Sequence, residues 1–209
     1  IYATVLEAGS QYGAVVALAA DGISERIRGD LYSPLGLAFQ PGTDVLYVSG
    51  RVVDDETGAE RGALWRLLSD GTLETVLDDL PCCFEEIANQ VNGLTFGPDG
   101  YLYLGVGAIT DRGESLNPDS EPFAELDERE ASILRVHPYT GETEVFASGI
   151  RKPYDLTFTS DGRAFATDNG LLTGPGDRLL AIETGGHHGW PFWRGRGCPD
   201  CPPARAQVD

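Results

Sequence analysis

The sequence predicts an all-β fold, a β-propeller of four-stranded antiparallel blades, and internal repeats are the first observation behind this prediction. Three segments align, and each contains a short apolar strand, a tight Pro/Gly/Asp turn and a second, alternating strand: 33–50, 90–107 and 152–170. Phe39, Phe96 and Phe158 are equivalent in this alignment. The period is therefore about 60 residues, close to the longer known blade repeats.

The second observation is that each of these strand pairs leads to another hairpin, with almost no helical periodicity in between. Further hairpins are expected at 62–77, at 131–147 and, more weakly, at 177–186, and residues 13–27 form another copy without a first half. Asp-Gly pairs are expected to supply the positive φ angles of two-residue turns, at 21–22, 70–71, 99–100 and 161–162. A β-sandwich is the alternative, and the equal, paired hairpins argue against it.

We expect one domain over residues 1–209, with blade parts at about 1–30, 31–80, 85–148 and 150–195. That is about three and a half blades, whereas known propellers use about four to eight. We therefore expect an incomplete propeller, six-bladed when complete, because an open arc would leave strand edges unpaired and core exposed. The other blades would come from further residues or from another chain.

Composition bounds the function classes. The 209 residues include 33 acids and 15 basic residues, for a formal net charge of -18. Such an excess of acids repels phosphate backbones, so nucleic acid is not an expected partner. No apolar run reaches the roughly 20 residues that a membrane-spanning helix needs, so no membrane span is expected either.

Four cysteines form two close pairs, Cys82 with Cys83 and Cys198 with Cys201. The C-P-D-C pair alone is half of a zinc site, and the vicinal pair does not easily supply the other half. Two disulfides are expected, with a metal site or buried free thiols as alternatives. Together with the acidic surface, this favours a secreted, periplasmic or cell-surface protein.

Blade topology predicts where the functional loops lie. In an up-and-down blade, the loop between strands 2 and 3 and the connection to the next blade emerge on one face. The Asp-Gly turns then lie on the opposite face, and the long, chemically varied loops share the mouth of a central channel. We expect seven polar residues around this mouth: Asn89, Gln90, Asn92, Arg151, Lys152, Asp168 and Asn169.

Arg151 and Lys152, the only lysine, stand side by side where a strand enters the channel wall. Two cations there would suit a carboxylate or phosphate ligand. Ion pairs with nearby acids are the alternative, and the spacing leaves both open. The acidic loop 111–130 lacks the spacing of an EF-hand and is interpreted as a solvated flap rather than a metal site.

Four motifs resemble the glucose/sorbosone dehydrogenase family, over about residues 85–195. They are NGLTFGPDGYLYL (92–104), ILRVHPYTG (133–141), GIRKPYDLTFTSDGRAFATDNG (149–170) and GGHHGWP (185–191). The resemblance implies a six-bladed quinoprotein that holds pyrroloquinoline quinone (PQQ), a tricarboxylate, with calcium over the channel. It also implies a sugar substrate, an electron acceptor, and a histidine that takes the sugar proton while hydride passes to the quinone.

Carried over by position, the resemblance assigns cofactor binding to Arg151, Lys152, Asn169 and Asp177, with Lys152 in place of a family asparagine. It assigns calcium binding to two main-chain carbonyls, those of Gly170 and Leu171. Asn89 takes the place of the general-base histidine, and an amide cannot accept a proton near neutral pH. None of the three histidines is an obvious replacement: His137, His187 and His188.

Three functions follow as hypotheses. The first is a PQQ- and calcium-dependent sugar dehydrogenase, which Arg151 and the TDNG segment favour. The second is a calcium-centred, lactonase-type hydrolase, because asparagine is common in such sites. The third is a non-catalytic propeller that serves as a binding or surface-assembly subunit, together with other copies or subunits, and the missing histidine favours it.

Overall fold

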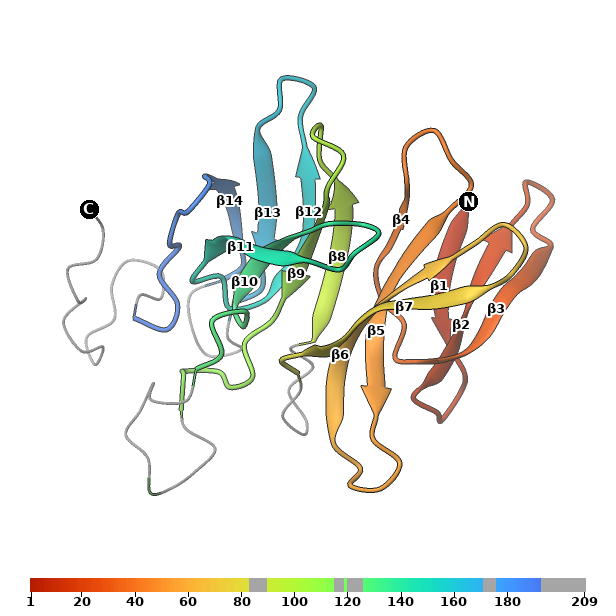
Figure 1. Ribbon diagram of the computed structural model, residues 1–209, viewed down its shortest axis with the longest axis horizontal. Coiled ribbons are helices and arrows are strands. Elements are labelled where there is room, and N and C mark those ends of the chain that lie inside the picture. Colours follow the sequence, from red (N-terminus) through yellow and green to blue (C-terminus); the bar gives the residue numbers. More distant parts are fainter. Residues whose placement is uncertain (83–89, 115–118, 120–125, 171–175, 193–209) are drawn as a thin grey trace.

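The computed structural model describes residues 1–82, 90–114, 119, 126–170 and 176–192. Within these residues there are 14 strands and no helix, so no helix is long and apolar enough to cross a membrane. The strands form successive antiparallel sheets side by side, as the blades of a β-propeller (Figure 1). The predicted fold class is confirmed.

The strands group by blade as follows. The first blade contains β1 (Tyr2–Leu6), β2 (Tyr12–Leu18) and β3 (Ser24–Tyr32). The second contains β4 (Leu37–Phe39), β5 (Leu46–Val53), β6 (Glu60–Leu67) and β7 (Leu73–Leu80). The third contains β8 (Val91–Phe96), β9 (Leu102–Val106), β10 (Ser132–Val136) and β11 (Thr143–Ser148). The fourth contains β12 (Pro153–Phe158), β13 (Ala164–Asp168) and β14 (Arg178–Ile182).

Strand order within each sheet follows chain order, as expected of an up-and-down blade. The first two blades form one continuous sheet only through the pairing of Tyr32 with Arg51, and β4 pairs with β5. The repeat comparison missed β1, which pairs with β2 from Tyr2 opposite Ala17 to Leu6 opposite Gly13. The alignment rested on a strand that contains Phe, and residues 1–12 contain none.

The Asp-Gly turns differ from the prediction in their length. Gly22, Gly71, Gly100 and Gly162 all have positive φ, as predicted. Each closes a three-residue loop, however: Gly22 N–H donates to the Ala19 carbonyl, and Ala19 N–H donates to the Ile23 carbonyl. The same two bonds recur at the other three turns. This is a type I turn followed by a left-handed glycine, so a two-residue turn was the wrong prediction.

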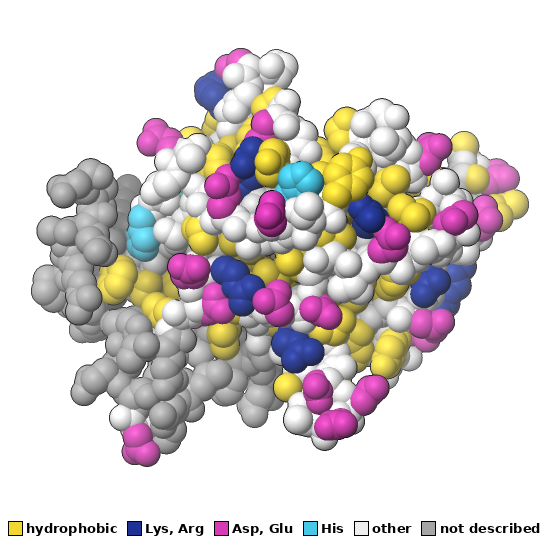
Figure 2. All heavy atoms as spheres, viewed as in Figure 1, with side chains coloured by type: hydrophobic (Ala, Val, Ile, Leu, Met, Phe, Trp, Pro, Cys, Tyr) yellow, Lys and Arg dark blue, Asp and Glu magenta, His cyan; other side chains and the backbone are white. Residues whose placement is uncertain are grey.

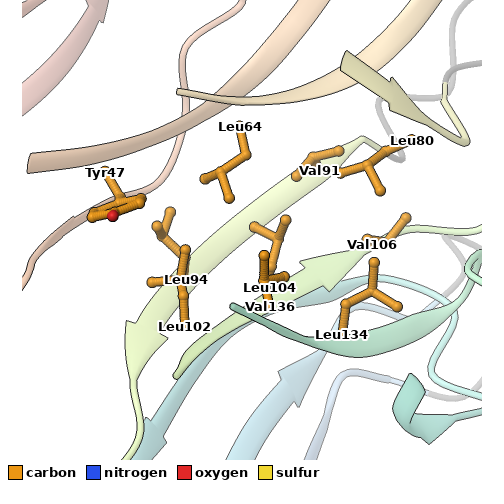
Figure 3. Packing of buried hydrophobic residues seen from close by; sticks show 10 residues of the cluster. All are labelled: Tyr47, Leu64, Leu80, Val91, Leu94, Leu102, Leu104, Val106, Leu134 and Val136. Atoms are coloured by element: carbon orange, nitrogen blue, oxygen red, sulfur yellow. The ribbon is translucent and has the colours of Figure 1, made fainter. Parts of the chain in front are cut away.

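Apolar side chains from neighbouring blades meet and form the core. Between the second and third blades, side chains of β5, β6 and β7 point toward those of β8, β9 and β10 (Figure 3). A second cluster joins the third and fourth blades around Tyr103 and Ile133, and a third joins the first and second around Val48 and Trp65. Blades therefore stabilise one another face to face.

Glycines set the spacing of the innermost strands. A Cβ atom added to Gly36 would lie 2.5 Å from the Asn92 carbonyl oxygen, and one added to Gly93 would lie 2.7 Å from the Tyr154 carbonyl oxygen. These glycines therefore let β4, β8 and β12 approach one another closely. Asp155 occupies the equivalent repeat position in the fourth blade.

Candidate functional site

The described residues that flank the long loops meet at the end of the blades opposite the Asp-Gly turns, as predicted (Figure 1). Three main-chain bonds join them: Gly107 N–H to the Gln90 carbonyl (3.2 Å), Ala108 N–H to the Arg151 carbonyl (2.7 Å) and Asn169 N–H to the Lys152 carbonyl (3.1 Å). We call the group around these bonds the mouth and define it by its residues: Arg51, Glu60, Gln90, 107–111, Arg151, Lys152, 168–170, Asp177 and Arg178.

Arg151 joins two loops of the mouth. Its Nε donates to Asp111 Oδ1 at 3.0 Å, and its Nη2 donates to the same oxygen. Its Nη1 donates to the carbonyls of Asn169 (3.0 Å) and Gly170 (3.3 Å). The Arg151 side chain is only 13% exposed. Of the two roles that the sequence left open for Arg151, the structure shows the ion pair with a nearby acid, Asp111.

Lys152 lies beside Arg151 but makes different contacts. Its main-chain N–H donates to Asp168 Oδ1 at 2.8 Å, and the residue is partly buried. Among the described residues, no carboxylate lies within ion-pair distance of its ammonium group. Burial is the main factor that lowers the pKa of Lys152, and the positive charges of Arg151 and Arg51 also lower it. The carboxylate of Asp111 raises it. Within the described structure, Lys152 is thus a cation without an ion-pair partner at the predicted position.

Asp168 fixes the main chain beside Lys152. It is 3% exposed and forms an ion pair of 2.5 Å with Arg178, whose Nη1 also donates to the His188 carbonyl at 2.9 Å. A buried carboxylate needs such charged and N–H partners to offset its lost hydration. The sequence placed Asp168 at the mouth, and the structure gives it a supporting role there.

A second ion pair lies on the side of the second blade. Arg51 Nη1 donates to Glu60 Oε2 at 2.7 Å, and Arg51 Nε donates to the Gln90 side chain. Tyr32 Oη donates to the other oxygen of Glu60 at 2.9 Å. The Arg51 charge is therefore already neutralised.

Two contacts hold the loop that carries Asp111. Trp190 Nε1 donates to the Asp111 carbonyl at 3.1 Å, and Ile109 N–H donates to Glu130 Oε2 at 2.7 Å. Glu130 is 5% exposed, and burial raises its pKa despite the two N–H groups that it accepts. The start of the acidic loop is thus built into the mouth, whereas the prediction treated the whole loop as a solvated flap.

The remaining predicted site residues divide into three groups. Asn169 and Gly170 contribute carbonyls to Arg151, and Asp177 Oδ1 accepts the Gly170 N–H at 2.9 Å, so these three lie together at the mouth. Asn89 and Leu171 lie outside the described residues. Asn92 is fully buried in β8, and both polar atoms of its side chain lack a hydrogen-bond partner within the described structure.

The histidines lie where the sequence placed them. His137 caps a hairpin turn through Nδ1, which accepts the Thr140 N–H at 3.1 Å. His187 and His188 follow β14, and His188 N–H donates to the Ser148 carbonyl at 2.8 Å, so this segment packs against the end of β11. Burial lowers the pKa of both His187 and His188.

Sequence reasoning missed Asp111 and Arg51 as mouth residues. Asp111 was grouped with the acids that follow it, and nothing in its spacing marks it as the partner of Arg151. A signal for Arg51 did exist in the repeats: it follows Phe39 by the same interval at which Gly170 follows Phe158. Extending the alignment by one residue would have placed it beside the channel.

The chain belongs to the glucose/sorbosone dehydrogenase family, whose profile matches residues 35–197. This match includes most of the mouth and confirms the family expected from the four motifs. No curated protein matches the sequence.

Solved structures agree with this family. An oxidoreductase (glucose dehydrogenase) of Thermus thermophilus is 25% identical with a TM-score of 0.69, over 94% of this chain and 66% of that one. The PQQ-bound aldose sugar dehydrogenase of Streptomyces coelicolor is 25% identical with a TM-score of 0.60, over 92% of this chain and 62% of that one. The PQQ domain of pyranose dehydrogenase from Coprinopsis cinerea, 12% identical with a TM-score of 0.59, shares the fold, over 92% of this chain and 54% of that one. This chain spans about two thirds of the first two.

Proposed function

We propose that this chain forms part of a PQQ- and calcium-dependent sugar dehydrogenase, with the mouth as the cofactor seat. One observation carries the proposal: a lysine with no ion-pair partner among the described residues stands at the mouth of a family propeller whose formal net charge is -18. A cation so placed suits the carboxylates of PQQ. The 25% identity with a PQQ-bound aldose sugar dehydrogenase supports the same cofactor.

The residues present fit a carboxylate ligand. Lys152 would bind it, Arg151 and Asp177 would hold the loop 169–170 beside it, and Asp168 would keep the Lys152 main chain in place. Calcium would take main-chain oxygens of Gly170 and Leu171, and carbonyl oxygens are ligands that calcium accepts. PQQ, when bound, supplies the hydride acceptor for oxidation of a sugar hydroxyl.

The proton of that hydroxyl needs a base, and Asn89 cannot serve near neutral pH. This leaves two outcomes within the family. Another group of the complete protein accepts the proton, or the protein binds PQQ without turnover and acts as a binding or surface-assembly subunit. A lactonase-type hydrolase would instead need calcium alone.

The test is a titration of the full-length protein with PQQ, with and without Ca²⁺, followed by aldose-dependent reduction of a dye. Saturable PQQ binding with turnover is the expected result. Binding without turnover would favour the non-catalytic subunit, and N89H would then be the variant to assay. Lactone hydrolysis without PQQ binding would favour the hydrolase, and no binding at all would refute the quinoprotein proposal.

We also propose a secreted, periplasmic or cell-surface location and two disulfides, on the ground of the four cysteines and the acidic composition. Three of the cysteines, Cys83, Cys198 and Cys201, lie outside the described residues. Mass spectrometry of the non-reduced, digested protein would identify the pairs, and four free thiols would refute this part of the proposal.

A further inference from the structure

The cationic side chains of the mouth divide into two kinds. Three arginines each have a carboxylate partner: Arg51 with Glu60, Arg151 with Asp111 and Arg178 with Asp168. Lys152 has none among the described residues, although it belongs to the same cluster of charges. The three arginine pairs cancel in charge, which leaves Lys152 and Asp177. Asp177 accepts the Gly170 N–H and forms no ion pair with the lysine in the described structure.

We propose that Lys152 is the anion-binding residue of the mouth, where it takes a carboxylate group of the ligand, and that Arg151 is a positioning residue. This division of roles rests on the proposed function where the ligand is PQQ. It departs from the family resemblance, which gives both residues the same role and has asparagine at the position of Lys152.

The bonding of Arg151 carries the first half of the argument. A guanidinium group has five N–H donors, and four hydrogen bonds already engage it, two to Asp111 and two to main-chain carbonyls. One N–H remains, so an anion could take two donors of Arg151 only by displacing Asp111 or one of the carbonyls. Arg151 therefore joins the loops 107–111 and 169–170 rather than facing a ligand.

The surroundings of Lys152 carry the second half. Its N–H donates to Asp168 and its carbonyl accepts the Asn169 N–H, so the main chain is fixed on both sides. The partly buried ammonium group has lost hydration, and it lies near two arginines as well as the carboxylate of Asp111. A carboxylate ligand would replace that hydration and offset the repulsion, which favours binding at this residue.

The single lysine of the chain allows a direct test. Reductive ¹³C-methylation of the full-length protein labels its lysines and the amino terminus, and the K152R variant identifies the Lys152 signal by its loss. Addition of PQQ is expected to shift the Lys152 methyl signal and to raise its pKa, because a bound carboxylate favours the charged amine. The amino-terminal signal should stay in place and serves as the control. An unmoved Lys152 signal under saturating PQQ would overturn the proposal.

Matched variants separate the two roles. K152Q is expected to weaken PQQ binding by about tenfold or more, the scale of one lost charge-assisted hydrogen bond, with an unchanged melting temperature. K152R, which keeps the charge, should largely restore the affinity. R163Q removes an arginine 69% exposed at an Asp-Gly turn and should change neither quantity.

R151Q is expected to lower the melting temperature, because two loops lose their connection, and to weaken PQQ binding less than K152Q does when assayed below that temperature. D111N tests the same connection from the other side and should lower the melting temperature and weaken PQQ binding less than K152Q does. If R151Q abolishes binding in a fully folded protein while K152Q binds normally, the roles are reversed and the proposal is wrong.

A second probe keeps this test separate from the proposed function. If the wild-type protein does not bind PQQ, the quinoprotein proposal fails, and citrate, a simple tricarboxylate, then tests the anion site itself. A shift of the Lys152 signal by citrate, absent with the neutral sugar glucose, would support the anion site without PQQ. No shift with either PQQ or citrate would refute the anion site as well.

Discussion

Charged side chains also form a network at the end of the blades opposite the mouth, centred on Asp99. This residue stands in an Asp-Gly turn, where its Oδ1 accepts the Tyr101 N–H at 3.2 Å. Its Oδ2 accepts Tyr103 Oη at 3.0 Å and Arg135 Nε at 2.8 Å. Partial burial opposes ionisation, but the bonds from Arg135, Tyr101 and Tyr103 outweigh it and lower the pKa of Asp99. Asp99 thus stabilises the fold as a carboxylate.

The D99N variant is expected to be less stable than the wild-type protein at neutral pH by about 1 kcal/mol, since the charge is partly screened by solvent. Folding lowers the pKa of Asp99, so its carboxylate stabilises the folded protein at pH values above the pKa that it has in the unfolded chain. This stabilisation is lost as the pH falls through the pKa that Asp99 has in the folded protein. The difference between the two proteins should therefore shrink below about pH 4.

Urea unfolding of both proteins at several pH values measures this. D21N is the matched control, since Asp21 makes the same turn bond to the Ile23 N–H at 3.0 Å and is not bonded to an arginine in the described structure. A stability difference for D99N that stays constant down to the lowest pH would contradict the assignment.

Among the strands, the positions of glycines decide how closely the innermost ones pack. Residue 93 has no side chain, and the main chain of β12 fills the space where one would be: the Cα of Asp155 lies 2.9 Å from the position of an added Cβ. Contacts below 3.0 Å to main-chain atoms cannot be relieved by rotation of a side chain. The spacing of β8 and β12 therefore depends on Gly93.

The G93A variant is expected to destabilise the protein by about 1 to 3 kcal/mol, as overpacking usually does. G176A is the control: nothing in the described structure lies within 4 Å of its added Cβ, and its φ is outside the left-handed region. Denaturant unfolding of both variants tests the difference. Equal stability of G93A and G176A would show that the inner strands can separate at little cost.

The core of the whole molecule lies between blades rather than within them. Figure 3 shows one cluster that receives side chains from two successive sheets, among them Leu64 from β6 and Leu104 from β9.

On the surface, acidic and basic side chains are interspersed over the face seen in Figure 2, despite the large net charge. Apolar contacts between blades therefore hold the molecule together, and neighbouring blades are expected to unfold together.

The L104A variant tests this coupling. Leu104 is fully buried, so its truncation should cost about 2 to 5 kcal/mol. Unfolding should remain a single transition, with the same midpoint by circular dichroism and by Trp fluorescence, which includes Trp65 in the second blade. L179A, at a side chain 73% exposed, should change stability by less than about 0.5 kcal/mol. A separate early transition in L104A would show that the third blade unfolds independently.

The sequence by itself determined the repeat, the strand pairs, the positive-φ glycines and the family. These features are local or periodic: alternation places side chains on one face or the other, and an Asp-Gly turn needs no distant partner. It also placed Arg151, Lys152, Asp168 and Asn169 at one mouth, because blade topology fixes which loops share an end.

Only the tertiary structure decided how those charges pair. Asp111 lies 40 residues before Arg151 in the chain, and its choice of that arginine over Lys152 depends on loop geometry that no spacing encodes. The structure likewise decided that the Asp-Gly loops have three residues and that β1 joins the first blade. Ion pairs and close packing are set by distances of a few ångströms in space, and those distances arise only when the blades pack against one another.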